Sequence, residues 1–178
     1  MSGDNVTQPF VGRSVIAAAV LMIGCSNGSP VPLEIAEVES GNLEGIDQFF
    51  AWFNKGSSHV RLQQYADAAI AYDQAFQLYA DLGDDDTQRP YRIMWYQTWP
   101  YWAYYYSGRY QDVIDLADTT LNDTISKPVL EESFYWRALA REALGDVQGA
   151  INDFRESVRL NPNFGPGWDQ LARLGVQG

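Results

Sequence analysis

The fold of this chain is indicated most clearly by residues 134–162, FYWRALAREALGDVQGAINDFRESVRLNP. After Phe134 the residues at +4, +13, +16, +20, +23 and +28 are Ala138, Val147, Ala150, Phe154, Ser157 and Pro162. The same offsets counted from Trp52 give Gly56, Tyr65, Ala68, Tyr72, Ala75 and Ala80. Both stretches therefore alternate large and small residues with one spacing, which predicts a single structural unit used more than once.

A degenerate third copy lies between these two. Its matching positions are filled by Gln97, Tyr101, Tyr110, Val113, Ala117 and Thr120. Turn residues precede the +13 position in every copy: Gln63-Gln64, Gly108-Arg109 and Gly145-Asp146. The pattern is that of the tetratricopeptide repeat, a unit of about 34 residues that contains two antiparallel helices joined by a tight turn.

The sequence therefore predicts an all-α fold, an α-α superhelix of three tetratricopeptide repeats plus a C-terminal capping helix. The expected repeats cover about residues 49–82, 94–127 and 131–164, and the capping helix covers 166–175, in a domain that spans 48–178. No repeat can bury its apolar face alone, so stacking must build the core. Trp168 is expected to dock on the last repeat, with Asp169, Gln170 and Arg173 on a polar outer face. Pro100 is expected within a helix, where it would cause a kink or a break.

Charge and composition exclude several classes of function. The net charge of −11 opposes nucleic acid and anionic lipid as partners. Cys25 is the only cysteine and His59 the only histidine, so neither a disulfide nor a Cys/His zinc site can form within the chain. We therefore expect no catalytic residue, cofactor or metal. An enzyme that uses carboxylates alone stays open as a minor alternative, although only Glu142 is expected in the groove.

The N-terminal residues resemble a bacterial lipoprotein signal. An apolar run at 15–24 is too short to span a bilayer and leads directly into Gly24-Cys25. The resemblance implies an export signal over residues 1–24, lipidation of Cys25 and a polar, acidic linker over 25–47. The protein is then exported and tethered at the extracytoplasmic face of a membrane. Two alternatives stay open: another export signal or uncleaved anchor, and a first helix that packs on a cytoplasmic domain.

Aromatic residues gather on the first helix of each predicted pair, which lines the concave face of such a superhelix. The chain is 14% aromatic, and much of this content falls between residues 91 and 110. Interface cores are enriched in aromatic side chains, so we interpret this face as a groove for an extended or proline-rich peptide or for another domain. The alternative is that the rings only fill the core. The expected partner-binding residues are Phe53, Asn54, Arg61, Trp95, Trp99, Trp102, Tyr105, Tyr106, Tyr135 and Trp136.

A narrower resemblance covers residues 48–175. Its blocks are residues 49–56, 91–98, 104–114, 129–136 and 161–166. They resemble the repeat region that follows a papain-like cysteine peptidase domain, of the bacteriocin-processing kind, in exported proteins of Chloroflexi-type bacteria. That peptidase carries an Asn-Cys-Gly-Pro-like motif, which this chain lacks.

The resemblance therefore implies the non-catalytic half of such a protein standing alone. We expect an adaptor or assembly scaffold that binds a protein or peptide. The alternative is an accessory or regulatory subunit of a separately encoded cysteine peptidase, whose peptidase domain would be the partner. The oligomeric state stays open.

Overall fold

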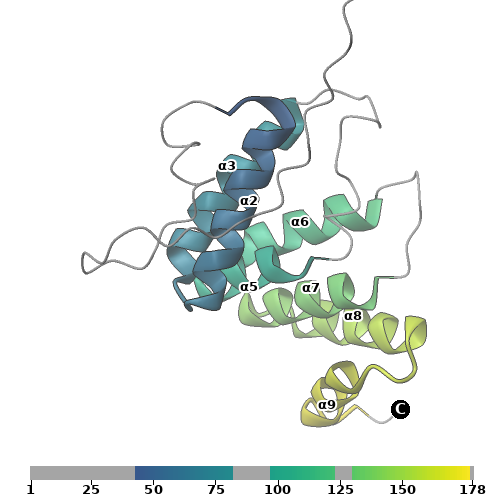
Figure 1. Ribbon diagram of the computed structural model, residues 1–178. Helices are drawn as coiled ribbons and strands as arrows, with labels where there is room; N and C mark the ends of the chain where they lie inside the picture. The colour runs from purple at the N-terminus through teal and green to yellow at the C-terminus, as the bar shows by residue number, and fades with distance from the viewer. Residues whose placement is uncertain (1–42, 82–96, 123–129, 177–178) are drawn as a thin grey trace, which may run out of the picture.

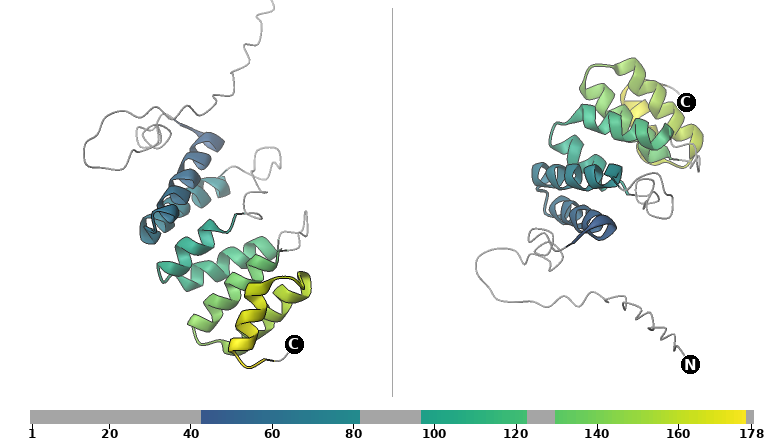
Figure 2. Two further views of the ribbon diagram at one scale, coloured as in Figure 1. Left: turned by 60° about the horizontal axis from the view of Figure 1, so that its bottom comes forward. Right: turned by 90° about the horizontal axis from the view of Figure 1, so that it is seen from above.

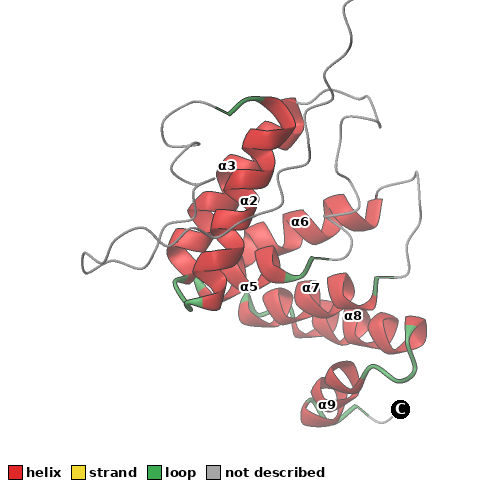
Figure 3. Cartoon of the chain, in the orientation of Figure 1, coloured by secondary structure: helices red, strands yellow, loops and turns green. Residues whose placement is uncertain are grey.

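The computed structural model describes residues 43–81, 97–122 and 130–176 (Figure 1). Helices are the only regular elements within these ranges, so the predicted all-α class is confirmed (Figure 3). In chain order they are α2 (Gly45–Arg61), α3 (Tyr65–Asp81), α5 (Trp99–Tyr106), α6 (Tyr110–Asn122), α7 (Glu131–Ala143), α8 (Val147–Leu160) and α9 (Gly165–Arg173). The predicted signal, Cys25, most of the linker and Trp95 lie outside the described residues.

The helices pack in pairs, and the pairs stack in chain order. Helix α2 packs on α3, α5 on α6, and α7 on α8. Contacts between α3 and α5 and between α6 and α7 join successive pairs, while α9 packs on α8 (Figure 2). Each pair thus covers the apolar face of the next, which is the packing that tetratricopeptide repeats require. None of the helices in the described part of the chain is long and apolar enough to cross a membrane.

The first helix of every pair ends in the same way, and so does α9. The residue two positions past the helix has a positive φ: 59° at Gln63, 79° at Gly108, 90° at Gly145 and 72° at Gly175. At Gly145 the backbone N–H donates to Glu142, and the next N–H, of Asp146, donates to Arg141. This pair of bonds is the Schellman motif, which satisfies the last carbonyls of a helix and reverses the chain.

Small residues at the repeat offsets allow the paired helices to approach closely. Ala68, Ala138 and Ala150 are fully buried between helices. At Gly56, a Cβ atom would lie 2.8 Å from the ring of Tyr72, so the ring packs directly on the glycine backbone. The large residues predicted at the other offsets fill the space beside these contacts, and Tyr72 and Phe154 are fully buried.

The mid-helix position expected for Pro100, and with it the kink, is wrong, whereas the expected break agrees with a helix that begins only at Trp99. Helix α5 has eight residues and begins at Trp99, so Pro100 lies in its first turn rather than in its middle. The backbone N–H groups of the first turn have no partner within the helix, and the missing N–H of proline therefore costs nothing there. Pro100 helps to start α5, and this start determines which aromatic side chains share each face of the helix.

Candidate functional site

Helix α5 separates its aromatic residues onto two faces. Tyr101, Ala103 and Tyr104 are buried in the core. Trp99, Trp102, Tyr105 and Tyr106 fall on the opposite side because they follow one another at helical spacing. Trp102 is 40% exposed and Tyr106 is 52% exposed, which is high for side chains of this size. Among the described residues of α5, this stripe is the part that solvent and a partner can reach.

Neighbouring helices extend the stripe in both directions. The ring of Tyr65, at the start of α3, lies 4.9 Å from that of Tyr106. Rings of Trp102 and Tyr105 each lie 5.7 Å from that of Trp136 on α7, which in turn contacts Tyr135. We call the accessible and half-buried members of this set the aromatic face: Tyr65, Trp99, Trp102, Tyr105, Tyr106 and Tyr135.

Two predicted binding residues are not on the surface. Phe53 is only 2% exposed and packs against Tyr72 of α3, with the two ring centroids 5.0 Å apart. Trp136 is 6% exposed and lies beneath Trp102 and Tyr106. Their placement on an open concave face is therefore wrong: both side chains belong to the core. Trp136 still supports the aromatic face from below, because the exposed rings rest on it.

The remaining predicted residues of α2 lie on its exposed side. Asn54 and Arg61 are both exposed and are seven residues apart, which places them on one side of the helix. The guanidinium of Arg61 lies 5.3 Å from the centre of the Trp99 ring, within the range of a cation–π contact. Arg61 therefore links α2 to one end of the aromatic face.

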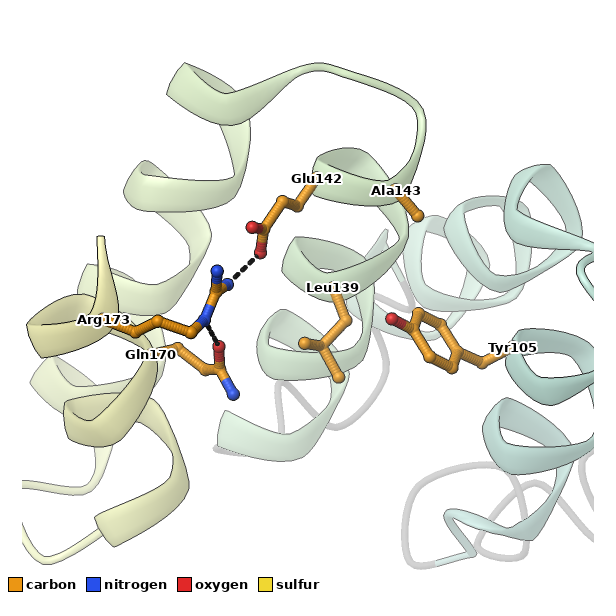
Figure 4. A pocket seen from close by; sticks show the side chains of 6 residues that line it. All are labelled: Tyr105, Leu139, Glu142, Ala143, Gln170 and Arg173. Atoms are coloured by element: carbon orange, nitrogen blue, oxygen red, sulfur yellow. Dashed lines mark hydrogen bonds and ion pairs between the residues drawn. The ribbon is translucent and has the colours of Figure 1, made fainter.

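A pocket of about 430 Å³ lies at the other end of the face, between α5, α7 and α9 (Figure 4). It is lined by Tyr105, Leu139, Glu142, Ala143, Gln170 and Arg173. Nη2 of Arg173 lies 2.5 Å from Oε2 of Glu142, and Nε of Arg173 donates to Oε1 of Gln170 at 2.7 Å. Gln170, expected on the polar outer face of α9, is instead half-buried beside this ion pair, whereas Arg173 is 51% exposed and still reaches α7.

The hydroxyl groups near this pocket are held in their neutral form. Burial raises the pKa of Tyr105, and the neighbouring hydroxyls of Tyr110 and Tyr106 and the carboxylate of Glu142 add to the rise. Burial likewise raises the pKa of Tyr135, although a hydrogen bond with Gln170 opposes the shift. At neutral pH these side chains therefore offer uncharged hydroxyl groups beside the one ion pair of the pocket.

Two parts of the site escaped the sequence analysis. The repeat spacing places Tyr65 at a packing position, yet the contact of its ring with that of Tyr106 makes it part of the aromatic face. Gln170 and Arg173 are expected only as part of a polar outer face of α9, yet both line the pocket. The available signal for Tyr65 was its place directly after a turn, where a first-turn residue faces the neighbouring pair. The position of Arg173 depends on the angle at which α9 docks, for which the sequence carries no signal.

Nothing in the described ranges assembles a metal site: they contain no group of three or more His, Asp or Glu side chains that could hold an ion. The single histidine, His59, places Nδ1 at 2.7 Å from Oε1 of Gln64. This contact joins the end of α2 to the start of α3. His59 therefore has a structural partner at the turn between these helices.

Comparisons with known proteins agree with this geometry. Family models described as tetratricopeptide repeat match residues 51–86 and 131–164. The chain therefore contains tetratricopeptide repeats at these residues, and such repeats generally act as protein-binding scaffolds. The RNA polymerase-associated protein CTR9 of Saccharomyces cerevisiae is 36% identical over 76 residues, which cover 41% of this chain and 7% of that protein. No solved structure matches the chain significantly. The matched regions contain repeats and no catalytic domain.

Proposed function

We propose that this protein is a non-catalytic adaptor that binds an extended peptide segment of a partner protein across the aromatic face. The observation that carries the proposal is the exposure of Trp102 and Tyr106 side by side on α5. Exposed aromatic rings in contact with one another offer a large apolar area at little cost in side-chain entropy, since each has only two rotatable bonds. Interface residues of this kind supply most of the binding energy in protein complexes.

The net charge of the chain indicates the charge of the partners that it can bind. With a net charge of −11, the protein favours partners that are neutral or basic. The rings of the face also present the negative side of their quadrupoles, which favours cations and the C–H groups of proline and aliphatic side chains. Arg61 above Trp99 illustrates this preference within the chain itself.

Selection from a random decapeptide display library tests the proposal. We expect peptides that bind the full chain and lose at least tenfold in affinity when Trp102 and Tyr106 are both changed to alanine. Both side chains are well exposed, so the variant should keep its helical circular dichroism spectrum. Ile70→Ala is the matched control, because Ile70 is an exposed apolar residue of α3 outside the aromatic face. The proposal would be contradicted if both variants lost peptide affinity equally, or if Trp102→Ala/Tyr106→Ala kept the affinity of the parent chain.

One protein partner follows from the resemblance of residues 48–175 to repeats that accompany a peptidase domain. A separately encoded cysteine peptidase domain of the bacteriocin-processing kind is the first folded partner to test on the same variants. Binding that depends on Trp102 and Tyr106 would make the protein an accessory subunit of that peptidase. If the chain bound the selected peptides but not the peptidase domain, it would be an adaptor and not a subunit of that peptidase.

We further propose that the protein is exported and held at the extracytoplasmic face of a membrane by a lipidated Cys25. The support is the sequence alone, in which a short apolar run leads into Gly24-Cys25. Growth of a bacterial host with an alkyne-labelled fatty acid should label the full chain, and Cys25→Ser should remove the label. An unlabelled parent chain in the cytoplasmic fraction would favour the alternative, a first helix packed on a cytoplasmic domain.

A further inference from the structure

We propose that the pocket between α5, α7 and α9 binds an arginine or lysine side chain of the partner, and that Arg173 is the intramolecular occupant which this side chain displaces. The inference rests on the proposed peptide-binding function and adds the chemistry of one subsite. Tyr105 belongs both to the aromatic face and to the pocket, so a peptide that crosses the face can continue into the pocket.

One wall of the pocket suits the aliphatic stem of a basic residue. Leu139 and Ala143 of α7 and the ring of Tyr105 form its apolar side (Figure 4). Long basic side chains bury their methylene groups against such surfaces and keep the charged end beside polar groups. A volume of about 430 Å³ accommodates an arginine side chain with room for water.

The carboxylate of Glu142, on the same helix as Leu139 and Ala143, supplies the acidic group of the pocket. Its Oε2 accepts from Arg173, whereas no hydrogen bond from a described residue reaches its Oε1. A carboxylate offers about four lone-pair sites and can accept two donors from one guanidinium. Glu142 therefore has unused capacity for a cation, and it lies in a strongly acidic protein that attracts basic partners.

Arg173 is a weakly held occupant. Its side chain is 51% exposed in the last turn of α9, and ion pairs of this kind contribute little to stability. Asp169 lies four residues before Arg173 on the same helix, the spacing at which an acidic and a basic side chain can pair. A displaced Arg173 thus has a second carboxylate nearby, which lowers the cost of displacement.

The probes are N-acetyl-arginine amide and its uncharged analogue, N-acetyl-citrulline amide, titrated into the full chain. Binding is followed by nuclear magnetic resonance through the methyl signals of Leu139 and the Nε–H signal of Arg173. We expect the arginine probe to shift both signals and the citrulline probe to bind at least tenfold more weakly. Glu142→Gln should abolish the shifts, because it keeps the shape of the side chain and removes its charge.

Arg173→Gln is the decisive variant. If Arg173 competes with the ligand, this substitution should tighten binding of the arginine probe roughly threefold, since a surface ion pair no longer has to break. Weaker binding to Arg173→Gln, or preferential binding of N-acetyl-aspartate amide, would overturn the proposal. The first result would show that Arg173 does not compete with the ligand, and the second that Arg173 is the ligand-binding group and Glu142 only its support.

The peptides selected from the library separate this inference from the proposed function. Each arginine of a selected peptide is replaced by citrulline, and each lysine by norleucine. Peptides that need Trp102 and Tyr106 but are insensitive to these changes and to Glu142→Gln would refute the basic subsite and leave the peptide-binding function intact. If the pocket bound the arginine probe but the library yielded no peptide, the proposed peptide-binding function would be refuted and the basic subsite would stand.

Discussion

At the scale of single residues, the charge network around Asp153 fixes α8 against α7. The Asp153 side chain is 6% exposed and accepts three hydrogen bonds, two from Arg137 at 2.7 and 2.9 Å and one from Arg141 at 2.8 Å. Arg137 also reaches Asp118 on α6. Burial opposes the charge of Arg137, but the bonds to Asp153 and Asp118 outweigh it and raise its pKa. One arginine thus joins the second helical pair to the third.

Asp153→Ala should therefore be strongly destabilising. The substitution leaves Arg137 largely buried without its main partner, and breaking a buried ion pair from one side typically costs about 3–5 kcal/mol. Urea unfolding followed by circular dichroism measures the change. Glu156→Ala is the control on the same helix, because Glu156 pairs with the well-exposed Arg159 and its loss should leave stability nearly unchanged. If both variants lost similar amounts of stability, the network around Asp153 would contribute no more to stability than a surface ion pair.

At the scale of helices, the close contact between α2 and α3 depends on Gly56. A Cβ atom there would lie 2.8 Å from Cε1 and 2.9 Å from Cζ of Tyr72. The ring cannot easily move, because it packs on Phe53 and its hydroxyl lies 3.0 Å from Oγ of Ser57. Gly56 is thus a packing requirement of the first repeat, even though glycine weakens the helix that contains it.

Gly56→Ala should lower the free energy of unfolding by about 1–2 kcal/mol. Overpacking lowers the free energy of unfolding by about 1–3 kcal/mol, and the better helix propensity of alanine raises it by up to about 1 kcal/mol. Gly165→Ala is the control, since a Cβ at this position of α9 meets no atom within 4 Å. Thermal and urea unfolding of both variants provide the measurement. A Gly56→Ala protein as stable as its parent would mean that the Tyr72 ring has room to shift.

The repeat spacing predicted the helices and their pairing, because small and large residues at fixed offsets are a direct consequence of how paired helices touch. The same spacing could not place single side chains on the concave face. Phe53 and Asn54 are sequence neighbours, yet one is buried and the other exposed, since the tilt of α2 on α3 decides between them. Arg173 reaches Glu142 only because of the docking angle of α9, which depends on contacts distant in the sequence.

At the scale of the whole molecule, buried tyrosines connect the stacked pairs. The hydroxyl of Tyr104 on α5 donates to Asp73 of α3, and that of Tyr101 lies 3.0 Å from Oγ of Ser133 on α7. Burial raises the pKa of Tyr72, Tyr101 and Tyr104, and the nearby carboxylate of Asp73 raises that of Tyr104 further. All three hydroxyls therefore stay neutral in the folded stack above pH 10, where tyrosines of an unfolded chain ionise.

This difference predicts that stability falls as the pH rises above about 10. The unfolded chain then binds fewer protons than the folded one, so the free energy of unfolding decreases with pH by about 1.4 kcal/mol per pH unit for each buried tyrosine. Urea unfolding between about pH 8 and pH 11 measures the slope, and absorbance of tyrosinate at about 295 nm should rise together with unfolding. Tyr101→Phe removes one of the three groups and should make the alkaline slope shallower, whatever its effect on stability at neutral pH. An unchanged slope in that variant would mean that Tyr101 ionises without unfolding and that the contact between the second and third pairs opens locally.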